Sequence, residues 1–184
     1  FVFDQKDNSV FASDILDFGK KLYSQGKEEL IIRDFFNDRK GGVFVDVGCA
    51  DYMHRSTTYY LEKHLGWSGI AIDALAEYAL GYIENRPNTR FFNFIVTDHS
   101  GNIEPFSRLI ESPSLSSTKE LRIIGKKRQV IYVPTITLTE LLEKNGISKI
   151  NFLSIDIEGG EAAALAGFDI KRFKPELVCI EKSG

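Results

Sequence analysis

Short apolar runs that alternate with helical segments constrain the fold of this chain more than any other feature. The runs Val43–Val47, Gly69–Ile72, Arg90–Val96, Ile150–Ile155 and Leu177–Ile180 have the length and composition of buried strands. The segments between them carry apolar residues at helical spacing, and several end at glycine or proline. Strands that alternate with helices in this way form a mostly parallel sheet with helices on both faces. We therefore expect a doubly wound α/β fold.

The chain is expected to form one domain preceded by a helical segment. Its 184 residues suit a single hydrophobic core of ordinary size. Apolar residues recur at helical spacing from about Ser13 to Arg39, with Gly26 dividing the region, and Gly41–Gly42 precedes the first strand. We therefore expect a helical segment at residues 1–41, packed on the core, and a single globular unit at residues 42–184.

The stretch from about residue 101 to residue 134 interrupts the alternation of strands and helices. Asn102–Phe106 and Gln129–Val133 have the composition of two further strands, and the polar run Ser112–Thr118 lies between them. A long loop inside a compact domain is often a lid or a substrate loop, and a surface excursion is an equal alternative. The chain ends soon after its fifth expected strand. Either the unit is shortened at its C-terminus, or the two extra strands complete its sheet differently.

Composition and charge limit the classes of partner. The net charge of -3, with Lys and Arg scattered along the chain, argues against a nucleic-acid binder, which normally has a basic stripe. No apolar run has the length of a membrane span, and no signal peptide is visible. Cys49 and Cys179 do not make a disulfide framework and indicate a reducing compartment. We therefore expect a cytoplasmic protein with no nucleic-acid or membrane partner, and the oligomeric state stays open.

Acidic side chains follow the expected strands at their carboxyl ends, the edge where a doubly wound sheet binds ligands. A carboxylate after the second strand can accept hydrogen bonds from both hydroxyls of a ribose. Asp73 stands there, at a distance from the first turn that is typical of dinucleotide folds. Asp73 could also cap the helix that follows. The acids near the strand ends are Asp46, Asp51, Asp73, Asp98, Asp156, Glu158, Glu161 and Glu181.

The first turn favours one nucleoside cofactor over another. A dinucleotide site needs the pattern Gly-x-Gly-x-x-Gly, whose backbone amides approach a pyrophosphate. The turn Gly48–Met53 has only the first glycine of that pattern, and the carboxylates of Asp46 and Asp51 would repel phosphate. S-adenosylmethionine carries a sulfonium and an ammonium and no phosphate. The electrostatics of the turn therefore favour S-adenosylmethionine over a nicotinamide cofactor.

Three blocks of this sequence resemble the FkbM family of S-adenosylmethionine-dependent methyltransferases, which have the class I, Rossmann-like fold. The similarity runs from about residue 42 to the C-terminus, and the third block is the most specific. The class I fold usually has seven strands, two more than the five expected here. The blocks are Val43–Asp51 followed by Ser56–Lys63, then Leu65–Asp73, then Ile150–Glu161.

The resemblance implies roles for individual residues. Asp46 would orient the first loop or meet the ammonium of the cofactor, Asp73 would hold the ribose, and Asp98 would accept from the adenine amine. Asp156 would lie closest to the sulfonium. Tyr52 stands where many relatives have glycine, and Asp73–Ala74 replaces a glutamate and proline that are common in the family. The cofactor-binding residues expected are Asp46, Gly48, Cys49, Ala50, Asp51, Ser56, Thr57, Asp73, Ala74, Thr97, Asp98 and Asp156.

The function expected is O-methylation of a small hydroxylated acceptor, such as a sugar or a natural product. The acceptor hydroxyl must lose its proton during or after attack, and the candidates for the base are Asp156, Glu158 and His54. Glu161 is expected instead to stabilise the start of a helix. Asp156, Glu158 and Glu181 could also hold a divalent metal ion, although a metal-free site is preferred.

Two other functions are kept as alternatives. The first is a binding or interaction module that keeps this fold and the cofactor site but has lost turnover, as the short C-terminus and Tyr52 would allow. The second is a nicotinamide-dependent dehydrogenase, against which the missing glycines of the first turn count. A turnover assay with hydroxylated compounds separates the first alternative from an active methyltransferase.

Overall fold

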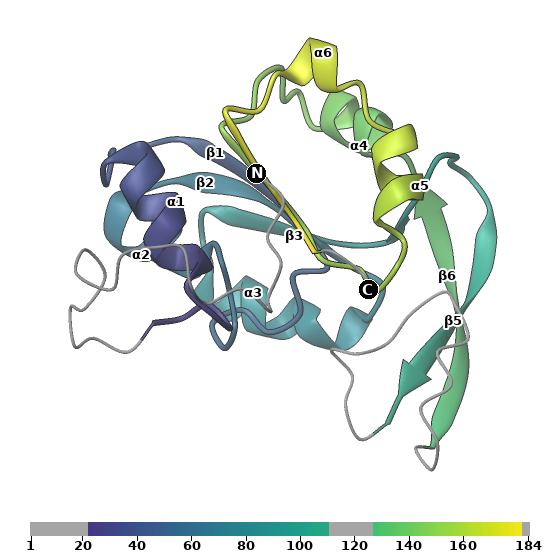
Figure 1. The fold of residues 1–184 in the computed structure, drawn as a ribbon. Coiled ribbons are helices and arrows are strands. Elements are labelled where there is room, and N and C mark those ends of the chain that lie inside the picture. Colours follow the sequence, from purple (N-terminus) through teal and green to yellow (C-terminus); the bar gives the residue numbers. More distant parts are fainter. Residues whose placement is uncertain (1–21, 111–126, 182–184) are drawn as a thin grey trace.

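The centre of the fold is a five-stranded sheet in which every neighbouring pair of strands is parallel (Figure 1). The computed structural model describes residues 22–110 and 127–181, so the polar run Ser112–Thr118 and the helical residues expected before residue 22 lie outside it. The predicted α/β class is confirmed. In spatial order the strands are β3 (Thr89–Asn93), β2 (Ser68–Asp73), β1 (Val43–Val47), β7 (Phe152–Ile155) and β8 (Leu177–Ile180).

The order of the strands creates a switch point beside β1. The chain moves outward from β1 to β2 and β3, and then returns to the opposite side of β1 to form β7 and β8. The connections that leave β1 and β7 therefore run to opposite sides, which opens a crevice at the carboxyl ends of these two strands. In open α/β sheets this crevice is where ligands bind.

Helices cover both faces of the sheet, as the alternation of side chains along each strand requires. Val45 and Val47 of β1 belong to a hydrophobic cluster that includes residues of α4, α5 and α6, which lie together in Figure 1. Phe44 belongs to a separate cluster with residues of α1 and α2. No helix in the described ranges is long and apolar enough to cross a bilayer. The helices are α1 (Glu28–Phe36), α2 (Tyr59–Leu65), α3 (Ala79–Asn85, after the 3₁₀ turn η1, Ala76–Tyr78), α4 (Leu138–Lys144), α5 (Glu161–Ala166) and α6 (Ile170–Phe173).

A second, three-stranded sheet contains the two extra strands expected from the sequence. These strands are β5 (Ile103–Leu109) and β6 (Arg128–Ile136), which pair in antiparallel fashion, and they do not extend the central sheet. The single strand expected over Arg90–Val96 is wrong, because the chain divides at Phe94 and its last part, β4 (Ile95–Val96), pairs with β6. At the division, the Phe94 N–H donates to the Asp73 carbonyl (3.1 Å).

Of the two helical segments expected on either side of Gly26, the second is confirmed as α1, which begins at Glu28. Leu22 and Tyr23, at the end of the first expected segment, are not helical. Ser24 instead forms an isolated bridge with Arg55, and its hydroxyl accepts from the Glu29 N–H (3.2 Å). The bridge places Ser24 beside Arg55, in the loop that follows β1. The proposed division at residues 41 and 42 stays a prediction.

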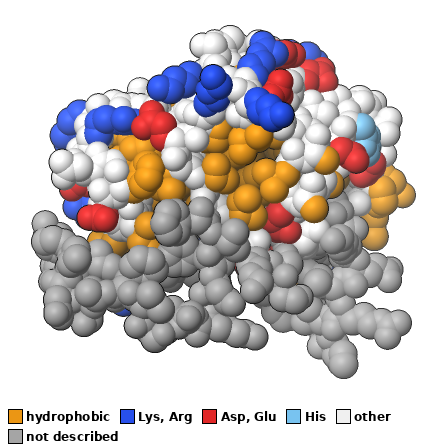
Figure 2. Space-filling view, turned by 45° about the horizontal axis from the view of Figure 1, so that its top comes forward, with side chains coloured by type: hydrophobic (Ala, Val, Ile, Leu, Met, Phe, Trp, Pro, Cys, Tyr) orange, Lys and Arg blue, Asp and Glu red, His pale blue; other side chains and the backbone are white. Residues whose placement is uncertain are grey.

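Charged side chains on α4 and α6 pair with one another. Arg172 of α6 pairs with Glu143 of α4, and Lys144 pairs with Glu140 one turn earlier on α4 (2.6 Å). Figure 2, which turns this side of the molecule forward, shows positively and negatively charged side chains close together. Exposed pairs of this kind contribute little stability individually. Their consequence is a surface on which the two signs of charge are mixed.

A buried ion pair joins the segments on the α2 side of the sheet. Arg86, after α3, and Glu62, in α2, are 1% and 3% exposed and are paired through the Arg86 Nε. The guanidinium also donates to the Tyr52 carbonyl (2.8 Å) and to the Thr58 carbonyl (3.3 Å). Glu62 in turn accepts from the Asn88 N–H (3.0 Å). Both charges are therefore surrounded by partners, as buried charges require.

Arg86→Ala tests this arrangement. Removing one member of a buried pair leaves the other charge without compensation, so we expect a loss of about 3–5 kcal/mol in the free energy of unfolding. Urea unfolding measures the loss. Adding Glu62→Gln to the same chain removes the uncompensated charge and should recover part of it.

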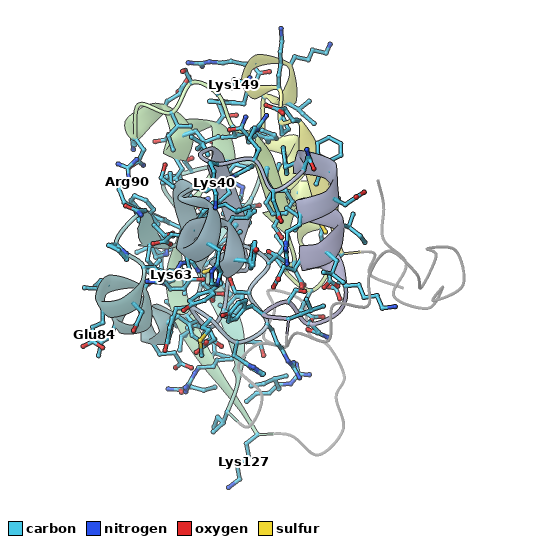
Figure 3. The ribbon with its side chains drawn as sticks, turned by 90° about the vertical axis from the view of Figure 1, so that its left-hand side faces the viewer. Lys40, Lys63, Glu84, Arg90, Lys127 and Lys149 are labelled. Carbon is cyan, nitrogen blue, oxygen red and sulfur yellow. The ribbon has the colours of Figure 1, made fainter. Side chains whose placement is uncertain are left out.

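The matched control is Arg90→Ala. Arg90 lies on β3 near Arg86, is exposed, and points outward in Figure 3. A surface substitution of this kind is expected to change the free energy of unfolding by no more than about 0.5 kcal/mol. Equal stability of the Arg86→Ala and Arg90→Ala variants would contradict the importance given to the buried pair.

Candidate active site

The register of the strands brings the residues after them to one edge. Val47 pairs with Ile72 and with Ile155, and Ile155 pairs with Ile180. The next residues along the chain continue the ladder: the Asp156 N–H donates to the Val47 carbonyl (2.9 Å), and the Gly48 and Glu181 N–H groups donate likewise (2.9 and 3.0 Å) to the carbonyls of Ile72 and Ile155. The carboxylates of Asp73, Asp156 and Glu181 therefore stand along a single edge.

A cleft opens at this edge and encloses about 770 Å³ of space, its open mouth included. Four residues with charged side chains line it in the described part of the chain, and all are acids: Asp73, Glu104, Asp156 and Glu158. Its apolar wall is formed by Ala74, Leu75, Phe94, Ile95, Val96 and Phe106. The expected site residues that line it are Gly48, Ala50, Asp73, Ala74, Thr97, Asp156 and Glu158.

Asp73 connects the loops that follow β1 and β2. One carboxylate oxygen accepts from the Ala50 N–H (3.0 Å) and the other from the Leu75 N–H (2.8 Å). The helix cap considered for Asp73 is wrong, because the turn η1 begins at Ala76 with Leu75 at its N-cap position and has no side-chain cap. The Asp73 side chain lines the cleft. Burial raises the pKa of Asp73 to about 6, and the two N–H donors oppose that rise. Each oxygen keeps acceptor capacity for a ligand.

Gly48 allows the loops after β1 and β7 to touch through their main chains. Its φ of +80° lies in the left-handed region, which favours glycine. A Cβ atom at this position would lie 1.7 Å from the Asp156 carbonyl oxygen, so no side chain fits. The first glycine of the turn is thus required by its contact with the second loop as well as by its backbone conformation.

Asp46 lies beneath the cleft and does not line it. Its carboxylate accepts from the Thr58 hydroxyl (2.9 Å) at the start of α2, close to the buried Arg86. Burial raises the pKa of Asp46 to about 6, and the Thr58 hydrogen bond, Arg86 and the Ser154 hydroxyl each work against the rise. Of the two roles expected for Asp46, orienting the first loop is the one that this position supports.

Other residues expected around the cofactor support the loop from below. Cys49 is buried, and its carbonyl accepts from the Tyr82 hydroxyl (3.3 Å). Asp51 accepts from the N–H groups of Met53 and His54 (2.9 and 2.7 Å), which closes a tight turn. The buried Ser56 hydroxyl accepts from the Tyr59 N–H (3.1 Å) at the start of α2. None of these three lines the main cleft within the described residues, and neither does His54, whose residue is exposed.

The sequence interpretation missed Glu104. Thr97 lines the cleft as expected, whereas Asp98 is exposed and its carboxylate contacts His99 Nδ1 (2.7 Å). The other ring nitrogen of His99 contacts Glu104 (2.7 Å), which does line the cleft. The carboxylates of Asp98 and Glu104 both raise the pKa of His99. The sequence did contain one signal, because Glu104 is a charged residue two positions before Phe106 in the expected strand Asn102–Phe106. The sequence did not show the pairing of this strand with β6, which turns Glu104 toward the cleft.

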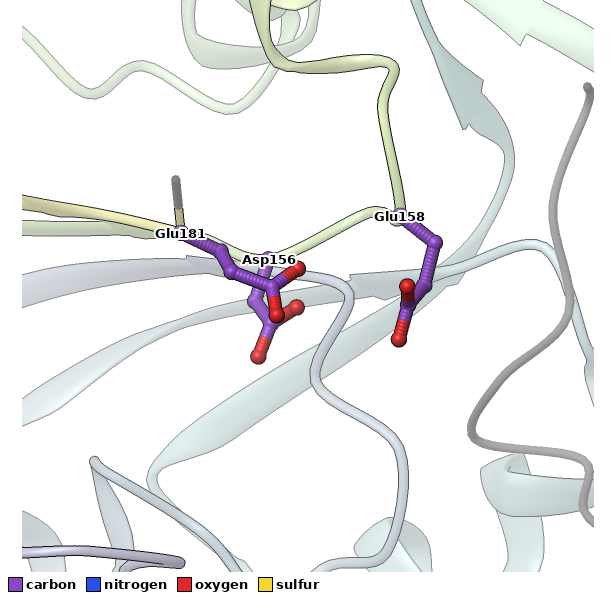
Figure 4. Close-up of side chains that lie close together, drawn as sticks. All are labelled: Asp156, Glu158 and Glu181. Atoms are coloured by element: carbon purple, nitrogen blue, oxygen red, sulfur yellow. The ribbon is translucent and has the colours of Figure 1, made fainter. Parts of the chain in front are cut away.

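Three carboxylates gather where β7 and β8 end. One oxygen each of Asp156, Glu158 and Glu181 lie within 4.8 Å of one another (Figure 4). Burial, Glu181 and Glu158 together raise the pKa of Asp156 to about 8. Glu161 accepts from the N–H groups of Ile157 and Gly159 (3.2 and 3.0 Å), which fixes the loop that carries Glu158.

The comparisons with known proteins agree with this geometry. A family model, the methyltransferase FkbM domain, matches residues 46–184. The chain belongs to the FkbM methyltransferase family. No significant match was found among curated proteins or solved structures. The FkbM resemblance expected from the three sequence blocks is therefore confirmed, and the chain is a methyltransferase.

Gly48→Ala tests the contact between the two loops. The added Cβ meets the Asp156 carbonyl, so the main chain of this FkbM domain must move, and we expect a loss of at least about 3 kcal/mol in the free energy of unfolding. The control is Gly146→Ala, since Gly146 also has a left-handed φ (+67°) but nothing within 4 Å of its Cβ position. The Gly146→Ala variant reports only the cost of placing a Cβ atom in the left-handed region, about 1–2 kcal/mol. Equal losses in urea unfolding would contradict the steric argument.

Proposed function

We propose that this protein transfers the methyl group of S-adenosylmethionine to a hydroxyl group of a small acceptor. Membership of the FkbM family supports methyl transfer. The observation that carries the cofactor assignment is the acid-lined cleft at the switch point, with Asp73 at the end of β2. When bound, S-adenosylmethionine supplies a methyl group on a sulfonium. The residues of the chain bind and orient the cofactor and the acceptor, and they take the proton of the acceptor hydroxyl.

The residues of the cleft fit this cofactor in chemistry. The apolar wall, with Leu75, Phe94 and Phe106, suits a flat adenine ring. Glu104, which His99 contacts, lines the cleft as Thr97 does, and we assign to it the acceptance of a hydrogen bond from the adenine amine that was expected of Asp98. Asp73 has free acceptor capacity for the ribose hydroxyls. Carboxylates also favour a ligand that carries a sulfonium and an ammonium and disfavour a pyrophosphate.

Asp156 is proposed as the base that takes the proton of the acceptor. Its carboxylate lies at the end of β7, where it lines the cleft beside Gly48. A pKa raised to about 8 makes it a stronger base than an ordinary carboxylate. Neither Glu158, whose pKa is also raised by burial and by Glu181, nor a divalent ion on the three carboxylates is needed for this step.

Calorimetry with S-adenosylhomocysteine tests the cofactor site. We expect binding by the unsubstituted chain, an affinity lowered about tenfold or more in Asp73→Ala, which loses hydrogen bonds to the ligand, and a smaller loss in Asp73→Asn. Glu84→Gln, an exposed position on α3 that points outward in Figure 3, is the control. Circular dichroism establishes that each variant is folded. No binding by the folded chain, or equal binding by Asp73→Ala, would refute the assignment.

The pH dependence of the rate tests the base. Asp156 acts only when deprotonated, so the single-turnover rate should rise with pH, reach half of its maximum near a pH of about 8 and level off above about pH 9. Asp156→Asn should lower the rate by about 10²–10⁴-fold and remove the rise. His54→Ala is the comparison, because His54 is the other candidate base outside the three carboxylates. A pH-dependent rise that persists in Asp156→Asn and disappears in His54→Ala would assign the base to His54.

A stability measurement must accompany each pH point. The pKa of Asp156 is higher in the folded chain than the value of about 3.9 in an unfolded chain. The folded chain therefore binds this proton more tightly, and its stability falls as pH rises from about 4 to about 8. Thermal unfolding at each pH separates a change in rate from a loss of folded protein, and Asp156→Asn should remove this part of the pH dependence.

A further inference from the structure

His99 lies between two carboxylates, one of which lines the main cleft. Its Nδ1 is 2.7 Å from the Asp98 carboxylate, and its Nε2 is 2.7 Å from the carboxylate of Glu104, the cleft residue. An ionised carboxylate can only accept hydrogen bonds, so both contacts are hydrogen bonds only when both ring nitrogens carry a hydrogen. The arrangement therefore corresponds to the protonated, positively charged ring.

The surroundings of His99 favour this charged form. Asp98, beside it in the same loop, and Glu104, on β5, are the charged groups that act on the ring among the described residues, and both raise the pKa of His99. On α4, whose start contacts this loop, the carboxylate of Glu140 is engaged by Lys144 (2.6 Å). The positive charge of the ring is thus matched by two carboxylates and opposed by no cation in this part of the structure.

The loop that carries His99 is anchored to β6 on both sides of the ring. β4, before the loop, pairs with β6 in parallel, and β5, after it, pairs with β6 in antiparallel fashion. The Thr97 N–H donates to the Ile136 carbonyl (3.1 Å). The Gly101 N–H donates to the Thr135 carbonyl, also at 3.1 Å. Because the main chain is fixed before and after His99, the ring has a defined position relative to β5.

Glu104 is placed by its strand but needs a partner to hold its carboxylate. Its side chain is long, 35% exposed and has several rotatable bonds, and within the described ranges His99 is the group that binds its carboxylate. Fixing such a side chain before a ligand arrives removes an entropic cost from binding. The same carboxylate keeps acceptor capacity for a ligand in the cleft.

We propose that His99, with both ring nitrogens donating, is a positioning residue that holds Glu104 against the purine ring of the cofactor and thereby selects a 6-amino purine. A fixed carboxylate accepts from the adenine amine and repels a carbonyl oxygen at the same ring position. A mobile carboxylate can shift to the neighbouring N1–H of a 6-oxo purine, so the selection requires Glu104 to stay in place. This inference rests on the proposed function, because it concerns the same cofactor.

Calorimetry at pH 6.5 with S-adenosylhomocysteine and S-inosylhomocysteine, in which a carbonyl replaces the amine, tests the selection. We expect the full chain to bind the inosine compound at least about tenfold more weakly, as for the loss of a hydrogen bond to a charged group. In His99→Ala the preference should fall below about threefold. In Glu104→Gln it should disappear, because the amide can donate to the carbonyl. An undiminished preference in His99→Ala would overturn the inference.

Two further variants separate positioning from a general structural role. His99→Arg should keep the tenfold preference, because a guanidinium can donate to both carboxylates. His64→Ala, an exposed histidine on α2 that does not line the main cleft, should also keep it. Circular dichroism establishes that each variant is folded. Loss of the preference in His64→Ala, or in a folded His99→Arg, would contradict the positioning role.

The pH dependence tests the requirement for two donating nitrogens. A neutral ring carries one hydrogen and can donate to only one of the two carboxylates. The affinity for S-adenosylhomocysteine, divided by that of His99→Arg, should therefore be constant at low pH and fall at least about twofold as pH rises through the raised pKa of His99. Asp73 and Asp156 are common to both proteins, so their titration cancels in this ratio. A ratio that stays constant from pH 6 to pH 9 would refute the role of the protonated ring.

The outcomes separate this inference from the proposed function. Failure of the folded chain to bind S-adenosylhomocysteine refutes the proposed function itself. Normal binding with a preference that His99→Ala leaves unchanged refutes only the role of His99. Equal binding of the two compounds by the unsubstituted chain refutes the role of Glu104 and this inference, and leaves the cofactor assignment in place.

Discussion

The Arg86 guanidinium and the Glu62 carboxylate form an ion pair that water scarcely reaches, and the rest of the site depends on it. A buried charge must find all its partners inside the protein. Arg86 does so by donating to the carbonyls of Tyr52, within the loop that follows β1, and Thr58, at the end of that loop. The Thr58 hydroxyl donates to the Asp46 carboxylate, so the position of Asp46 depends on the same ion pair. The loop that borders the main cleft is therefore supported from beneath by this buried ion pair.

The sequence predicted what depends on local pattern. The strands Val43–Val47 and Leu177–Ile180 have the same bounds in the structure as in the prediction, because a short apolar run between turns determines a buried strand. The division of the third strand at Phe94 was not predictable in this way. The pattern stays apolar through Val96, and only pairing with the parallel strand β6, more than thirty residues later, places β4 in another sheet.

The same distinction holds for the candidate site. Asp73 and Asp156 were predicted at the cleft because they directly follow strands whose ends are aligned by parallel pairing. Asp46 is one residue earlier than the end of β1, and strand alternation turns it toward α2. Glu104 enters the cleft from the second sheet, so its place depends on tertiary pairing that no local spacing encodes.

The contact between Gly48 and Asp156 has a consequence for motion. Two loops that meet through side chains can slide past one another as rotamers change, but here main chain meets main chain with no intervening atoms. Neither loop can advance without pushing the other, so they should fluctuate as one body. The distance between groups bound by the loop after β1 and groups bound by the loop after β7 is thus fixed by this main-chain contact. Substitutions elsewhere in the chain leave that distance unchanged.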